Sequence, residues 1–156
     1  MTDASAKFLV RAGLQQLLAL IEASGFDCIV PQVRDGAIVY ERMGSAAEFP
    51  KGIRASQQPG EYRLEQAGDR RLFAWANGPQ ALKPLLFAPE EPLWRARRTE
   101  HGFAVEGCIP QTAPLAVTGV RACDLAALAI QDKIFLQGPY PDPCYAARRE
   151  SLFLVA

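Results

Sequence analysis

The sequence predicts an α/β or α+β fold: a mixed sheet with early β-hairpins and a βαβ-like C-terminal part, flanked by helices. Two observations support this class. In the first half of the chain, pairs of short apolar segments flank Asp-Gly or Gly-Asp, a pattern typical of hairpins. Between residues 115 and 156, strand-like and helix-like segments alternate. The length of 156 residues suits one domain, either alone or as part of a longer protein.

A helix followed by a hairpin is expected at the start of the chain. Residues 7–24 carry apolar side chains at helical spacing, and Gly25 ends this stretch. Residues 26–33 and 37–43 are apolar segments on either side of Asp35-Gly36. Because Asp-Gly favours the tight turn of a two-residue hairpin loop, these segments predict a pair of antiparallel strands.

The next part of the chain is expected to hold a loop and a second hairpin. Residues 44–60 are rich in Gly, Pro, Ser and Gln, which predicts a long irregular connection. Residues 61–66 and 70–76 flank Gly68-Asp69 and supply apolar positions on both sides. They therefore predict strands that pair with each other.

The middle of the chain contains several short predicted elements. Residues 79–87 predict a short helix that Pro84 interrupts, and residues 89–98 predict another helical turn or two. Residues 103–109 and Leu115–Thr118 predict strands.

Two helices and a strand are expected at the C-terminal end. Residues 125–135 predict a helix that ends before Gly138-Pro139, and residues 142–150 predict a short helix. Residues 152–156 predict a final strand. Because natural termini are usually polar and exposed, an apolar strand at the last residue indicates a chain cut within a longer protein, with a natural end as the alternative.

Composition and charge restrict the class of protein. Hydrophobic residues make up 49% of the chain and charged residues 22%, which is enough apolar material for a core. Seventeen basic and seventeen acidic residues balance, so no nucleic-acid partner is expected from bulk charge. No apolar run approaches the ~20 residues of a membrane span, and no signal-peptide pattern is present. We therefore expect a cytoplasmic location.

Cys123 lies at the predicted turn between strand Leu115–Thr118 and the following helix, with Arg121 and Asp124 beside it. The positive end of the helix dipole and the charge of Arg121 both favour a thiolate, the form that binds soft metals and iron–sulfur clusters. The alternative is a small buried cysteine at a helix start. Asp124 is expected to be the N-cap residue, and Arg121 either tunes a bound cluster or pairs with Asp124.

The segment from residue 119 to 150 resembles the signature of the iron–sulfur proteins of the sulfhydrogenase beta family, which includes the corresponding iron–sulfur component of anaerobic sulfite reductase. The family text is close to G-V-R-P-C-D-L, an aliphatic helix, D-x-x-F, and D-P-Y-Y-x-x-R-R-E. The matching residues are Gly119, Val120, Arg121, Cys123, Asp124, Leu125, Asp132, Phe135, Asp142, Pro143, Tyr145, Arg148, Arg149 and Glu150. Ala122 replaces the usual Pro, and Cys144 replaces a usual aromatic residue. Residues 78–94 resemble a second, weaker family stretch, G-x-x-x-x-K-x-x-L-F-P-P-x-E-x-L-W.

The resemblance implies an amino-terminal domain in which Cys123 is one ligand of a [4Fe–4S] cluster. The other three cysteines, and a ferredoxin-like domain with two clusters, would lie beyond Ala156, so this chain alone would bind none. The domain would be an electron-transfer component with no bond chemistry of its own. Its partners would be a flavin-containing NAD(P)H subunit, and also a catalytic hydrogenase or sulfite reductase subunit.

The runner-up interpretation is a cofactor-free interaction or scaffold domain. Its contact surface would be the basic cluster of Arg95, Arg97 and Arg98, binding an acidic partner. The plainer interpretation of the same cluster is a solvated face after Trp94. Arg148, Arg149 and Glu150 are expected to anchor the last helix against the Cys123 turn, either as structural ion pairs or in a functional role.

The other candidate sites have weaker support in the sequence. Because no C-x-x-C occurs and the cysteines are far apart in sequence, a complete four-cysteine site within this chain is not expected. Cys28 and Arg34 have the spacing of a phosphatase loop, but the residues between them lack glycine and include Pro31, which argues against phosphate binding. Cys144 is expected to pack in the interior and His101 to lie on the surface. A hydrolase with Cys123 as nucleophile lacks a credible base, and no nucleotide-binding motif occurs.

Overall fold

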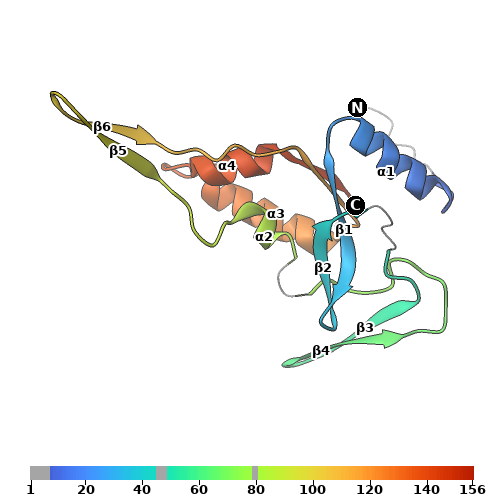
Figure 1. Cartoon of the computed structure of the whole chain (residues 1–156). Helices are drawn as coiled ribbons and strands as arrows, with labels where there is room; N and C mark the ends of the chain where they lie inside the picture. Colours follow the sequence, from blue (N-terminus) through green and yellow to red (C-terminus); the bar gives the residue numbers. More distant parts are fainter. Residues whose placement is uncertain (1–7, 45–48, 79–80) are drawn as a thin grey trace.

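The computed structural model describes residues 8–44, 49–78 and 81–156, and a four-stranded sheet forms its centre (Figure 1). The strand order is β2-β1-β7-β8. These strands are β1 (Asp27–Arg34), β2 (Ala37–Arg42), β7 (Leu115–Thr118) and β8 (Leu152–Val155). The β1–β2 pair is antiparallel, whereas β7 runs parallel to both β1 and β8. The predicted mixed sheet of an α/β protein is therefore confirmed.

The hairpin predicted around Asp35-Gly36 is present. Arg34 pairs with Ala37, and the two turn residues have positive φ angles of 48° and 75°. Two consecutive positive φ angles are what a type I′ turn requires, and its twist matches that of the flanking strands. Local sequence therefore determines this hairpin.

Helices cover both faces of the sheet (Figure 1). Alternation along β1 directs Cys28 and Val30 toward α1 (Gly13–Ala23), where they form a core with Leu18 and Ile21. On the opposite face, β1 and β7 contribute to a second core with α2 (Lys83–Leu86), α3 (Ala122–Phe135) and α4 (Pro143–Glu150). Its buried members are Ile29, Leu82, Leu86, Val117, Val120, Leu128 and Tyr145. No helix of the described residues has the length and apolar character needed to span a bilayer.

Two further hairpins lie outside this sheet, and both differ from the sequence prediction. The first pairs β3 (Ile53–Gln58) with β4 (Glu61–Gln66). The second pairs β5 (Trp94–Thr99) with β6 (Gly102–Gly107) and extends away from the body of the molecule (Figure 1). Each therefore forms a separate two-stranded sheet.

The sequence prediction for the second hairpin was wrong about which strands pair. Residues 61–66 pair with β3, which lies in the stretch expected to be an irregular connection, and residues 70–76 form no strand. Of that connection, residues 45–48 lie outside the described residues. Trp75 explains the difference: it is only 2% exposed and packs in the interior, so its segment is held by tertiary contacts instead of an alternating ladder.

Three predicted helix boundaries also need correction. Residues 89–98 do not form a helical turn; their second half is β5. Pro92 disfavours a helix there, and pairing with β6 satisfies the backbone. The first helix begins at Gly13, later than predicted, and Lys7 lies outside the described residues. Helix α3 begins at Ala122, three residues earlier than predicted, whereas α4 and β8 lie where expected.

Candidate functional site: the turn that carries Cys123

Cys123 lies in the first turn of α3, and its side chain is exposed. Strand β7 ends at Thr118, and Gly119 turns the chain with a φ of 81°. A side chain at Gly119 would come within 3.1 Å of the Phe73 ring, so both the backbone angle and the space favour glycine. The predicted strand–turn–helix around Cys123 is thus confirmed.

The end of β8 lies beside this turn. The backbone N–H groups of Gly119 and Val120 both donate to the carbonyl oxygen of Val155, at 2.8 and 3.1 Å. Parallel strands place their carboxyl ends at the same edge of a sheet. Ala156 therefore follows directly at the edge where Cys123 is exposed.

Asp124 is not the N-cap residue, contrary to the sequence prediction. Arg121 holds that position with an extended backbone, and Asp124 is the third residue of the helix. The Asp124 carboxylate accepts from the Arg121 N–H at 3.0 Å and from the side-chain amide of Asn77. The Cys123 sulfur lies 3.9 Å from the same carboxylate. Asp124 is 7% exposed, so these bonds hold a buried charge at the positive end of the helix.

Tyr40 and Asn77 connect the turn to distant parts of the chain. The Tyr40 hydroxyl donates to the Gly119 carbonyl at 2.9 Å, and it lies 3.4 Å from the Asn77 side-chain oxygen. Burial raises the pKa of Tyr40 to about 12, so the phenol is neutral at physiological pH. Sequence reasoning missed both residues. The only nearby signal was the weaker family stretch, which begins one residue after Asn77.

The Arg121 side chain contacts the segment before Asn77. One interpretation of the sequence paired this side chain with Asp124, and the structure does not show that pair. Its guanidinium donates to the carbonyl oxygens of Phe73, at 2.9 Å, and Trp75. The same group lies 4.7 Å from the centre of the Trp75 ring, a cation–π distance. Arg121 therefore fixes the loop of Phe73 and Trp75 against the turn.

The remaining cysteines lie elsewhere. Cys28 is buried under α1, and burial together with nearby Glu22 and Asp27 raises the pKa of its thiol. Cys144 is buried, with its sulfur 3.7 Å from the carbonyl oxygen of Cys108, which confirms the packing role. All four cysteines are free. In the part of the chain that the structure describes, no group of three or more His, Cys, Asp or Glu side chains could hold a metal ion.

The Arg148–Glu150 group does not anchor α4 against the Cys123 turn. Arg149 pairs with Asp132 in the last turn of α3 at 3.1 Å, and the Tyr145 hydroxyl donates to the same carboxylate at 2.7 Å. Arg148 pairs with Glu91, which precedes β5. Because α4 packs beside α3 and the start of β5, its basic residues reach these partners instead of the turn.

The predicted basic cluster lies on the β5–β6 hairpin. Arg95, Arg97 and Arg98 are all exposed, and so is His101 in the hairpin turn, as predicted. Because side chains alternate along a strand, Arg95 and Arg97 occupy one face and Arg98 the other.

Comparison of the chain with protein-family models, curated proteins and solved structures gives no match.

Proposed function

We propose that this chain is a domain of a cytoplasmic iron–sulfur electron-transfer subunit similar to those of the sulfhydrogenase beta family, including the corresponding iron–sulfur component of anaerobic sulfite reductase. The position of Cys123 carries the proposal. Its thiol is exposed in the first turn of α3, beside the end of β8. A segment following Ala156 would start next to this thiol, where further cysteines can reach the same group. The match of residues 119–150 to the family signature supplies the second support.

This chain would supply one of the four ligands of a cluster. A [4Fe–4S] cluster is held by four thiolates, and Cys123 would supply one of them. Cys28 and Cys144 are buried, and the half-buried Cys108 lies at the base of the β5–β6 hairpin beside α4, so the proposal takes the other ligands from a segment beyond Ala156. When bound, the cluster would carry electrons from a flavin-containing NAD(P)H subunit to a catalytic hydrogenase or sulfite reductase subunit, or in the reverse direction.

The turn's own residues would hold the thiolate and adjust its surroundings. The bonds of Asp124 to Asn77 and to the Arg121 N–H fix the first turn of α3. The backbone N–H groups of Arg121, Asp124 and Leu125 already donate within the turn, so those of Ala122 and Cys123 would be the ones to bond sulfur atoms. The charge of Arg121 would favour the more negative, reduced state of a nearby cluster.

Anaerobic expression of the full-length protein tests the ligand role. We expect Cys123→Ser to lose the iron and sulfide of one cluster, while Cys108→Ser, on a half-buried cysteine at the base of the β5–β6 hairpin, keeps them. The measurement is iron and sulfide content per protein, with electron paramagnetic resonance of the reduced sample. Equal iron in Cys123→Ser and the unchanged protein would end the claim.

A second candidate function, partner docking without a cofactor, is favoured by the β5–β6 hairpin. All residues of its two strands except Ala104 are exposed. Trp94, Phe103 and Val105 lie on one face and are 63%, 73% and 65% exposed. An isolated two-stranded hairpin is marginally stable in water, so a partner that covers the apolar face would stabilise it.

Contacts with α4 fix the base of this hairpin, and the residues at its tip are exposed. Glu91 pairs with Arg148 of α4 just before β5, and the Cys144 sulfur contacts the Cys108 carbonyl just after β6. The hairpin therefore extends in a defined direction from α4 (Figure 1). With Arg95 and Arg97 on the face opposite the apolar one, the partner that fits is a protein with an apolar groove bordered by carboxylates.

Co-expression of the full-length protein with its flavin subunit separates the two candidates. We expect Val105→Ser and Arg97→Glu to reduce the amount of complex on size-exclusion chromatography without changing iron content. Arg63→Glu is a matched control, since Arg63 and Arg97 have side chains 72% and 77% exposed, each on a two-stranded hairpin. Unchanged assembly in both hairpin variants would rule out docking by this surface.

A further inference from the structure

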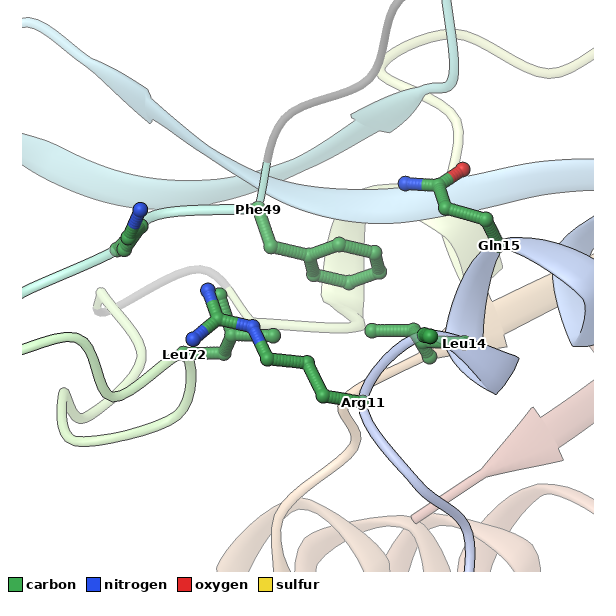
Figure 2. Close-up of a pocket in the computed structure, with 7 residues that line it drawn as sticks. Arg11, Leu14, Gln15, Phe49 and Leu72 are labelled. Atoms are coloured by element: carbon green, nitrogen blue, oxygen red, sulfur yellow. The ribbon is translucent and has the colours of Figure 1, made fainter.

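A cavity of about 480 Å³ lies beside the first turn of α1, on the opposite face of the sheet from α3 and α4 (Figure 2). It is lined by the start of α1, by the segment of Phe49 and Lys51, and by Leu72. Volumes of 300–1,000 Å³ are typical of small-molecule sites. None of the residues discussed for the Cys123 turn lines it.

One wall of the cavity is apolar and held in place. Phe49 is only 6% exposed and packs edge-on against Phe73, with ring centres 5.5 Å apart. Leu14 and Leu72 pack against the same core. Figure 2 shows the Phe49 ring between Leu14 and Leu72, and these three side chains form the apolar wall of the cavity.

The rim of the cavity is positively charged. Arg11 donates one N–H to the Arg70 carbonyl at 2.8 Å, which positions the guanidinium and leaves its other N–H groups available. Lys51 adds a second positive charge, and Gln15 adds an amide. The described lining includes no acidic residue, and neither Arg11 nor Lys51 forms an ion pair within the described part of the chain.

We propose that this cavity, the α1 pocket, binds a small organic anion with an apolar body, of the class of aromatic carboxylates. The ring would lie against Phe49 and Leu14, and the carboxylate would meet Arg11 and Lys51. A guanidinium fork matches the two oxygens of a carboxylate, whereas a neutral amide of the same shape gains no charge interaction. The inference is independent of the cluster proposed at Cys123.

Titration of the full-length protein with naphthalene-2-carboxylate tests the proposal by calorimetry. Naphthalene-2-carboxamide and inorganic phosphate are matched probes: the first lacks the charge and the second lacks the apolar body. We expect the carboxylate to bind more tightly than either probe. If the carboxamide binds as tightly as the carboxylate, the charges of Arg11 and Lys51 do not contribute to binding. If phosphate binds as tightly, the apolar wall does not contribute.

Two variants locate the site. We expect Arg11→Gln and Lys51→Gln each to weaken carboxylate binding about three- to fivefold, which corresponds to an ion pair of about 1 kcal/mol at an open rim. Lys83→Gln, at an exposed position of α2 outside this pocket, should bind as the unchanged protein does. An unchanged thermal midpoint confirms folding of each variant. No detectable heat of binding, or equal weakening by Lys83→Gln, would overturn the proposal.

Discussion

The side-chain amide of Asn77 donates a hydrogen bond to the carboxylate of Asp124, although the two residues are 47 positions apart in the chain. This bond joins the loop after β4 to the first turn of α3. It also satisfies a carboxylate that is 7% exposed and would otherwise have only the Arg121 N–H as a well-aligned donor. The position of Cys123 thus depends on a residue far from it in sequence.

Removal of this amide should destabilise the protein. Because Asn77→Ala leaves a buried carboxylate short of a donor, we expect a loss of about 1–3 kcal/mol in the free energy of unfolding. Urea unfolding followed by circular dichroism measures it. Gln57→Ala, which removes an exposed amide from β3, is the control and should change stability little. Equal effects of the two variants would contradict the role of Asn77.

Thiol labelling should rank the cysteines by exposure. In the folded chain of residues 1–156, iodoacetamide at neutral pH is expected to modify Cys123 well before Cys28 and Cys144. Burial raises the pKa of both slower thiols and also blocks access to them. Peptide mass spectrometry over time gives the rates, and Cys123→Ser should lack the fast step. Fast labelling of Cys28 would show that α1 does not cover it.

Acid should weaken the contact between α4 and the start of β5. The hydrogen bond from Arg148 lowers the pKa of Glu91, so the folded protein binds this proton less tightly than the unfolded chain does. The resulting stabilisation is present above the ordinary pKa of glutamate, about 4.3, and is lost as the pH falls through the folded value.

Glu91→Gln tests this contact. We expect the free energy of unfolding of this variant to fall less on acidification than that of the unchanged protein, because residue 91 then has no carboxylate to protonate. Urea unfolding across the acid range provides the measurement. Glu106→Gln is the control, because Glu106 is 73% exposed and 4.0 Å from Arg97. Identical acid profiles for Glu91→Gln and the unchanged protein would contradict the assignment.

Two glycines with similar backbone angles should respond differently to substitution. Gly52 and Gly60 have φ angles of 64° and 74°, so alanine at either position costs about 1 kcal/mol in backbone strain. At Gly52 the added Cβ would also lie 2.4 Å from the Asp69 carbonyl oxygen, whereas Gly60 faces open space. Because the Asp69 backbone must move, we expect Gly52→Ala to cost about 1–3 kcal/mol more in unfolding free energy than Gly60→Ala. Equal midpoints in urea would contradict this packing.

Hydrogen exchange should separate the β5–β6 hairpin from the central sheet. Strands β1 and β7 pair with each other and lie between two buried cores, whereas β5 and β6 pair only with each other. We expect amides of β5 and β6 to exchange orders of magnitude faster, because local opening exposes them without unfolding the core. Mass spectrometry of exchanged peptides measures the difference. Protection equal to that of β1 would show that the hairpin is stable by itself.

Local signals in the sequence predicted the elements that local chemistry controls. Asp35-Gly36 specified the first hairpin, and a short apolar run together with Gly119 specified the strand and turn before α3. Asp142 and Pro143 marked the start of α4, where the Asp142 carboxylate accepts from two backbone N–H groups. Such signals act within a few residues, so they can be read without the fold.

The mispredicted elements depend on contacts between distant segments. The pattern around Gly68-Asp69 predicts two paired strands, but Trp75 is buried near Arg121, and β4 pairs with β3. The roles of Tyr40 and Asn77 were likewise invisible, because no spacing rule links them to a turn some fifty to eighty residues later.

By itself the sequence determined the mixed α/β class, the position of Cys123 at a strand-to-helix turn, and the absence of a charge pattern for nucleic acid. Only the tertiary structure decided that this thiol is exposed beside the end of β8, which residues hold its turn, and that a cationic, apolar cavity forms beside α1. The physical reason is that backbone propensity acts over one or two turns of chain. Burial and hydrogen-bond partners are set by segments that meet only after folding.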